Sequence, residues 1–254
     1  MNKKLLFISM LLIFGLLLAA CGGSAGQSPE ATPVSSGAGA AGEDASTDPG
    51  SGDATVAVMD IGIDPANLSS ENATDIVAYL YEGLVRIQDD GAIAGLLAGE
   101  VVVSEDGLDY IFTLRQGVAF QDGSLLNSDV VVWNFNRWFD PANANRGDGE
   151  YSAWAANFGG FKGEVTEDGL PKSEVDGIEK VDEFSFIIHL NTPDADFLNK
   201  MADPAFSVIS PKTLVGTGPY MAASSDGGSL TLEPFAGYWN AASIPSEGMQ
   251  VPAP

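Results

Sequence analysis

The chain has 254 residues, of which 45% are hydrophobic and 18% charged, and its formal net charge is -24 at pH 7. This acidic balance argues against nucleic acid as a partner and against electrostatic attraction to anionic lipids. Cys21 is the single cysteine, which excludes an intramolecular disulfide and a cysteine-based zinc or redox site.

The first twenty residues have the pattern of an export signal. Lys3 and Lys4 provide a positive start, and Leu5 to Leu18 form an apolar run that is short for a membrane span, which needs about 20 apolar residues. The run ends in Leu18-Ala19-Ala20-Cys21, the pattern of a lipobox. We therefore expect residues 1–20 to be a lipoprotein signal peptide and Cys21 to carry a lipid that anchors the protein outside the membrane. An uncleaved signal anchor with an incidental cysteine is the alternative.

The segment from Cys21 to Asp53 consists largely of Gly, Ala, Ser, Pro and Thr and contains no aromatic residue. Such a composition buries too little apolar surface to offset the entropy of ordering, which predicts a disordered tether. Residues 54–240 then form one domain by length. Residues 241–254, rich in Ala, Ser and Pro, are expected to be a short tail.

The first half of this domain predicts a strand, a helix and the beginning of a sheet. Thr55 to Val58 is a β-branched run, and the strand should end at Asp64-Pro65. Apolar residues at three-and-four spacing from Ala73 to Leu84 indicate an amphipathic helix. A hairpin region with a turn at Asp89-Asp90-Gly91 follows, and alternation from Tyr110 to Leu114 indicates a half-buried strand.

The second half continues with helix, loop and hairpin patterns. Asn127 or Ser128 can cap a helix that carries Val131, Phe135 and Trp138, and the Gly-, Asn- and Asp-rich residues 141–171 are expected to be a long loop. A hairpin over 178–190 and a short helix over 195–201 follow. These elements predict a mixed α/β domain with a largely antiparallel sheet component.

Residues for catalysis are scarce. His189 is the lone histidine, and its mid-strand position favours an exposed or edge imidazole over a general base. Neither a Gly-x-Ser-x-Gly serine motif nor a phosphate loop or dinucleotide fingerprint is present in the folded part. We therefore expect no enzyme, no cofactor and no metal site.

Several segments, in this order along the chain, resemble the extracellular solute-binding proteins of the oligopeptide, dipeptide and nickel type. They are Asp64-Pro65-Ala66, Tyr81-Glu82-Gly83-Leu84-Val85, Ser104-Glu105-Asp106-Gly107 with the strand to Arg115, Gly117 to Gly123, Ser128-Asp129-Val130, Phe186 to Leu190, Gly216-Thr217-Gly218-Pro219-Tyr220 and Gly237-Tyr238-Trp239-Asn240. The resemblance implies a periplasmic-binding-protein-like type II lobe with a mixed sheet and flanking helices.

The resemblance also implies where a solute binds. In this family the ligand lies in a cleft between two lobes that close by hinge motion, and bound peptides pair with backbone strands. The lobe present here would contribute Asp60, Ile61, Gly62 and Ile63 and, after the helix that carries Trp133, the aromatic residues Tyr151 and Trp154. The alternative for Tyr151 and Trp154 is packing onto the core.

The resemblance further implies capture of a peptide or similar small solute outside the cell and its delivery to the permease of an ABC importer. Members of this family are about twice as long, so the second lobe is expected to be missing, because residues 241–254 are too few to build it. Three explanations stand beside one another: a truncated gene, a partner chain that supplies the other lobe, or a degenerate surface lipoprotein with a structural or interaction role and no transport.

Overall fold

The structure is a computed structural model that describes residues 61–68 and 71–253. The expected signal peptide, Cys21, the tether, the first strand and Asp60 lie outside the described residues. The described elements, in chain order, are η1 Pro65–Asn67, α1 Glu71–Leu80, β1 Val85–Ile87, β2 Ile93–Gly95, β3 Ala98–Val103, β4 Asp109–Leu114, α2 Ser128–Phe139, α3 Ser152–Phe158, β5 Val175–Lys180, β6 Ser185–Leu190, α4 Phe197–Met201, η2 Pro204–Phe206, β7 Tyr220–Ser225, β8 Ser229–Pro234, η3 Ala241–Ser243 and β9 Met249–Pro252.

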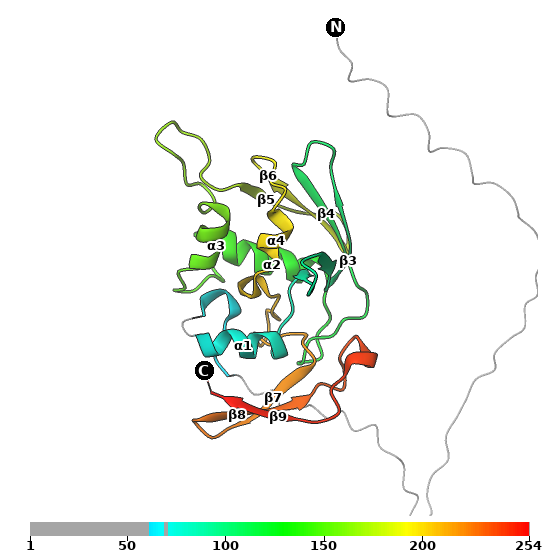
Figure 1. The fold of residues 1–254 in the computed structure, drawn as a ribbon. Coiled ribbons are helices and arrows are strands. Elements are labelled where there is room, and N and C mark those ends of the chain that lie inside the picture. The colour runs from blue at the N-terminus through cyan, green and yellow to red at the C-terminus, as the bar shows by residue number, and fades with distance from the viewer. Residues whose placement is uncertain (1–60, 69–70, 254) are drawn as a thin grey trace, which may run out of the picture. The chain divides into compact units, whose positions relative to one another are not determined.

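The four-stranded antiparallel sheet β3-β4-β6-β5 forms one side of the larger core. Alternate residues of its two inner strands are buried, as the two-residue period of a strand requires: Tyr110, Phe112 and Leu114 on β4, and Phe186, Ile188 and Leu190 on β6. Phe112 pairs with Phe186 across the sheet, and their rings stack with centroids 5.1 Å apart. The helices α2, α3 and α4 lie along this side of the sheet (Figure 1), and their aromatic residues complete the core.

A second, smaller core lies between α1 and the antiparallel sheet β7-β8-β9. The helix contributes Ile76, Val77 and Leu80, and the sheet contributes Ala222, Leu230 and Leu232. Figure 1 shows α1 beside this three-stranded sheet, between it and the larger core. Residues 61–64 run next to α1, so the smaller core supports the part of the chain that the resemblance assigns to solute binding.

Two expectations about these sheets need correction. All strand pairings among the described residues are antiparallel, so these residues do not form the mixed sheet that the resemblance implies. The expected tail at 241–254 contains η3 and the strand β9, which pairs with β8 from Leu232↔Met249 to Ser229↔Pro252. Alternation of Met249 and Val251 toward α1 explains the pairing, since both side chains pack against the smaller core.

The expected long loop over 141–171 is also wrong in part, because it contains the helix α3. Trp154 and Phe158 lie four residues apart, hence on one face of the helix, and both are buried. Gly159 ends the helix in a left-handed conformation, and its N–H donates to Ala155 O. Burial of two large rings therefore stabilises a helix of only seven residues that has no side-chain cap at its start.

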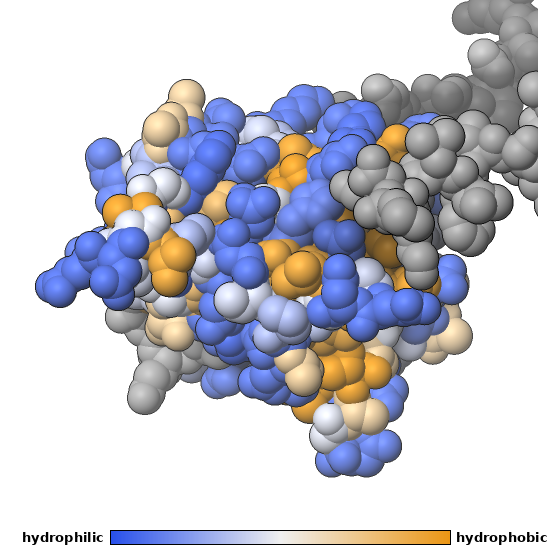
Figure 2. Space-filling view, turned by 90° about the horizontal axis from the view of Figure 1, so that it is seen from above, coloured by the Kyte–Doolittle hydropathy of each residue, from blue (hydrophilic) through white to orange (hydrophobic). Residues whose placement is uncertain are grey.

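The outside of the described part carries scattered apolar side chains. Figure 2 shows one face, which is largely hydrophilic with hydrophobic side chains gathered in a few separate patches. The large apolar residues that are exposed come from several loops and strands: Ile87, Val102, Val103, Leu125, Val165, Leu170, Val181 and Leu214. Single exposed apolar residues are normal on protein surfaces. Exposure alone therefore does not mark one of them as a binding residue, and its position and backbone geometry must be considered as well.

Candidate functional site

The segment from Ile61 to Asp64 is held by one side chain that follows α1 and one from α2. On one side, the hydroxyl of Tyr81, just after α1, donates to the carbonyl oxygen of Ile63 at 3.2 Å. Within the segment, Gly62 has φ +65°, and a Cβ added there would meet nothing within 4 Å. The backbone conformation, and not lack of space, therefore favours glycine at this position.

On the other side, Asp64 makes a bidentate ion pair with Arg137 of α2. The two contacts are 2.6 Å (Nη1 to Oδ2) and 3.1 Å (Nη2 to Oδ1), and the Arg137 side chain is only 4% exposed. Burial of Asp64 opposes ionisation, but the hydrogen bonds and charge of Arg137 outweigh it, so the pKa of Asp64 lies below its ordinary value. Asp64 also caps η1 by accepting from Ala66 N. A charged carboxylate thus locks the end of the segment to α2.

Tyr151 forms a hydrogen bond with the arginine of this ion pair. Its hydroxyl accepts from Arg137 Nη1 at 3.2 Å and donates to the carbonyl of Arg146 at 2.6 Å, while the Arg146 guanidinium lies 4.1 Å from the centre of the Tyr151 ring. Tyr151 is 1% exposed. The structure therefore joins Tyr151 to the Ile61–Asp64 segment through one arginine, with the phenol ring inside the protein.

Trp154 is also 1% exposed and lies among the rings of Phe135, Phe139 and Phe158. Its indole N–H donates to Gly160 O at 3.1 Å, so its one polar group is satisfied internally. Packing onto the core is thus the arrangement seen for both aromatic residues, and their contact with a solute stays a prediction.

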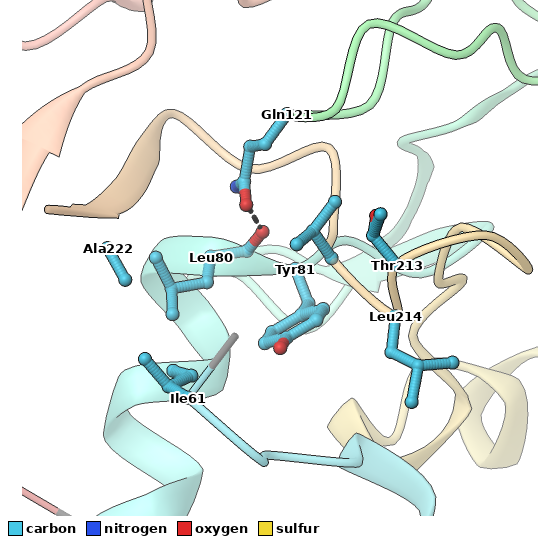
Figure 3. A pocket seen from close by; sticks show the side chains of 8 residues that line it. Ile61, Leu80, Tyr81, Gln121, Thr213, Leu214 and Ala222 are labelled. Carbon is cyan, nitrogen blue, oxygen red and sulfur yellow. Dashed lines mark hydrogen bonds between the residues drawn. The ribbon is translucent and has the colours of Figure 1, made fainter. Parts of the chain in front are cut away.

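A small cavity of about 10 Å³ lies between the Ile61 end of the segment and two loops (Figure 3), and its lining consists of Ile61, Leu80, Tyr81, Gln121, Thr213, Leu214, Val215 and Ala222. This volume is enough for about one water molecule, whereas pockets that enclose small ligands measure roughly 300–1,000 Å³. The buried Gln121 amide bridges the cavity wall by donating to Leu80 O at 2.8 Å and to Tyr220 O at 2.6 Å. Beside Ile61, the described residues therefore form a wall, not a pocket that could enclose a solute.

Glu82 joins three of the sequence motifs at one buried carboxylate. Its oxygens accept from the hydroxyls of Thr217 and Tyr238, both at 2.8 Å, and from the indole N–H of Trp239 at 2.9 Å. Burial raises the pKa of Glu82 despite these three donors, and burial together with the Glu82 charge raises the pKa of Tyr238 far above its usual range. Tyr238 therefore stays protonated and able to donate.

The glycines of the Gly216-Thr217-Gly218 motif have a steric role at the same place. A Cβ on Gly216 would overlap the backbone of Leu80 and Tyr81, and one on Gly218 would overlap Tyr79 and Leu80. Gly218 N donates to Leu80 O at 3.0 Å. Only residues without a Cβ can pass so close to the end of α1, and this approach brings Thr217 to Glu82.

His189 lies apart from this site, on the inner strand β6. Its Nδ1 is 2.8 Å from Asp109 Oδ1 and its side chain is 32% exposed. No group of three or more His, Cys, Asp or Glu residues suited to a metal ion occurs among residues 61–68 and 71–253. No described helix is long and apolar enough to cross a membrane.

The chain belongs to the bacterial extracellular solute-binding proteins, family 5, whose middle-region profile matches residues 92–249. This is a family of solute-binding proteins, not of enzymes.

Comparison with individual proteins gives the same family and shows partial coverage. The glutathione-binding protein GsiB of Salmonella typhi is 33% identical over 171 residues, which are 63% of this chain and 29% of that protein. GsiB of Escherichia coli K12 is 30% identical over the same coverage. Among solved structures, HbpA2 from Haemophilus parasuis superposes with a TM-score of 0.61 at 24% identity, covering 75% of this chain and 40% of HbpA2.

The periplasmic binding protein DppA from Helicobacter pylori, solved with the peptide STSA, superposes with a TM-score of 0.60 at 22% identity, covering 75% of this chain and 40% of DppA. The chain thus spans less than half the length of these relatives. The likeness to HbpA2 and DppA shows the fold: an α/β lobe that corresponds to part of a larger binding protein.

Three residues that organise the site were not identified as such from the sequence. Arg137 and Gln121 act on partners far along the chain, at separations of 73 and 99 residues, and no local pattern reports such pairs. Glu82 stood in a recognised motif, but its role as the acceptor for Thr217, Tyr238 and Trp239 follows only from the folded arrangement. The one available signal was its position as an acid directly after an apolar helix.

Proposed function

We propose that the chain is the solute-binding component of an ABC importer, which captures a peptide or similar small solute outside the cell and delivers it to a membrane permease. The observation that carries this proposal is the Ile61–Asp64 segment, which is fixed by Tyr81 and Arg137. Tyr81 directly precedes Glu82, the residue at which the sequence motifs meet. A backbone segment held rigidly at both sides is suited to pair with an extended ligand, because its hydrogen-bonding groups need no ordering on binding.

Two relatives support a proposal for the solute class. GsiB is named for binding glutathione, and DppA was solved with the peptide STSA. Both ligands are short peptides or peptide derivatives, so we propose the same class here. Asp60, Ile61, Gly62 and Ile63 would provide the backbone contacts, and Tyr151 and Trp154, if the lobe rearranges on binding, the aromatic ones.

The location proposed for this activity is the outer side of the cell membrane, periplasmic or at the cell surface, with the protein held by a lipid on Cys21. The support is the signal-like start of the chain together with the extracellular family. Replacing Cys21 with serine should release the protein from the membrane fraction, and a membrane-bound Cys21→Ser protein would contradict the anchor.

Isothermal titration of the full chain with mixed pools of di- to hexapeptides, and separately with glutathione, tests the binding proposal. We expect saturable heat with at least one pool. Exchange of Tyr151 or Trp154 for alanine should then weaken binding if these rings reach the solute, whereas a lower melting temperature with unchanged affinity assigns them to the core alone.

A second function is favoured by a specific observation. The described residues enclose only about 10 Å³ at the candidate site. A degenerate surface lipoprotein with a structural or interaction role and no transport would have this feature. Absence of heat with every pool would support this second function and contradict the first.

A further inference from the structure

Leu214 combines two unfavourable features at one position. Its φ is +61°, and among the described non-glycine residues it shares a positive φ only with Tyr151. The left-handed conformation brings Cβ too close to the backbone, so side chains other than glycine, and to a lesser extent Asn and Asp, rarely adopt it. In contrast to Tyr151, which is buried, Leu214 also leaves 41% of its surface exposed to solvent. Glycine at this position would remove both costs.

The surrounding loops hold Leu214 in this conformation. Its N–H donates to Ser210 O at 2.9 Å, and Ser210 N donates to Val215 O at 2.8 Å, which closes a tight turn. Asp122 fastens this turn to the neighbouring loop by accepting from Thr213 Oγ1 at 2.6 Å and from Ser210 Oγ at 2.7 Å. Strained residues persist where the structure around them over-determines their backbone, and such residues cluster at ligand sites.

The turn places Leu214 beside the candidate site. Leu214 lines the same small cavity as Ile61 and Tyr81, and Figure 3 shows Tyr81 between the other two side chains. Tyr81 in turn fixes the carbonyl of Ile63. An exposed, conformationally fixed apolar side chain therefore lies next to the segment proposed to pair with the solute.

We propose that Leu214 is a specificity-determining residue that contacts an apolar group of the captured solute. This inference rests on the proposed function and adds to it a preference for peptides with an apolar side chain at one position. Contact with such a side chain would bury the exposed surface of Leu214, and its fixed backbone means that little conformational freedom is lost on binding.

The test uses the full chain and two variants, Leu214→Gly and Leu214→Asn, since both residues tolerate the left-handed conformation while neither offers an apolar side chain. The probes are three pairs of tripeptides in which leucine or asparagine occupies one position and alanine the other two. We expect the unaltered chain to bind the leucine peptide of one pair at least about 10-fold more tightly, in the range that apolar contacts provide. Both variants should reduce this ratio to about 1 without lowering the melting temperature.

Leu170→Asn is the matched control, because Leu170 is 63% exposed and lies outside the cavity lining; it should keep the preference. Equal preference in the unaltered chain and both Leu214 variants would overturn the inference and leave the proposed function intact. A fall in melting temperature with unchanged preference would also overturn it, by assigning Leu214 to contact with protein. If the unaltered chain binds no peptide in any pool or pair, the proposed function and this inference fail together.

Discussion

At the scale of single residues, the buried carboxylate of Glu82 joins its own motif to two motifs that lie far along the chain. Its partners Thr217, Tyr238 and Trp239 lie 135 to 157 residues further along, and each would lose its acceptor if the carboxylate were removed. Buried donors without an acceptor are costly. The motif residues thus stabilise the lobe through their hydrogen bonds to this carboxylate.

Replacing Glu82 with alanine should lower the free energy of unfolding by about 2–4 kcal/mol, because three buried or half-buried donors are left unpaired. Denaturant unfolding followed by circular dichroism measures this change. Glu82→Gln keeps one acceptor oxygen and should lose much less, and Glu100→Ala, at an exposed position of β3, should change stability by less than about 0.5 kcal/mol. Equal effects of Glu82→Ala and Glu100→Ala would contradict the role of the carboxylate.

The pH dependence of stability tests the same residue. Burial raises the pKa of Glu82, so the folded protein holds this proton more tightly than the unfolded chain does. The resulting stabilisation is complete below the unfolded pKa of about 4.3 and is lost as the pH rises through the folded pKa. The stability of the unaltered chain relative to Glu82→Gln should therefore fall with rising pH across this window. A difference that stays constant with pH would show that the pKa of Glu82 is not raised.

The hydroxyl of Tyr151 also stabilises the fold, because it forms hydrogen bonds with the Arg137 side chain and with the carbonyl of Arg146. Tyr151→Phe keeps the ring and should lower the free energy of unfolding by about 1–2 kcal/mol through loss of these two bonds. Tyr79→Phe is the control, because Tyr79 contributes a ring contact with Tyr220 but no hydroxyl bond among the described contacts. Thermal unfolding that is equally affected by both changes would contradict this account.

At the scale of elements, α2 and α3 show what local sequence can and cannot predict. For α2, an N-cap candidate precedes apolar residues at helical spacing, and the structure confirms the helix with Asn127 as its cap, accepting from Val130 N at 3.0 Å. For α3, the start is Tyr151 in a left-handed conformation without a side-chain cap. Tertiary packing of Trp154 and Phe158 stabilises that helix, and the side-chain cap that predicts a helix start is absent.

Asn127→Ala should lower the free energy of unfolding by about 1 kcal/mol, since the N-terminal N–H groups of α2 lose their side-chain acceptor. Because α2 carries Arg137, its loosening should also weaken the hold on the Ile61–Asp64 segment. Asn127→Ser supplies another capping oxygen and should restore most of the loss in a urea titration. A loss of the same size in Asn127→Ser would assign the effect to something other than capping.

At the scale of the whole molecule, ordered motifs predicted the family and the α/β lobe, while the site residues stay a prediction. Ile61 to Ile63 were assigned by resemblance, and the structure shows two contacts of this segment: Tyr81, just after α1, donates to Ile63 O, and Arg137 of α2 pairs with the adjacent Asp64. Such pairs depend on how α1 and α2 pack, which periodicity does not specify. For Tyr151 and Trp154, packing onto the core was the alternative to solute contact, and both residues are buried; the helix α3, which carries Trp154, was not predicted.

We propose that a peptide binds at the wall formed by the Ile61–Asp64 segment, Tyr81 and Leu214. The most direct measurement is nuclear magnetic resonance of the isotope-labelled full chain, titrated with the peptide that gives the largest calorimetric heat. We expect saturable shifts of the amide signals of Ile61, Gly62 and Ile63 and of those around Leu214, with little change in the β5 and β6 strands. Shifts confined to β5 and β6, or no shifts at saturating peptide, would contradict it.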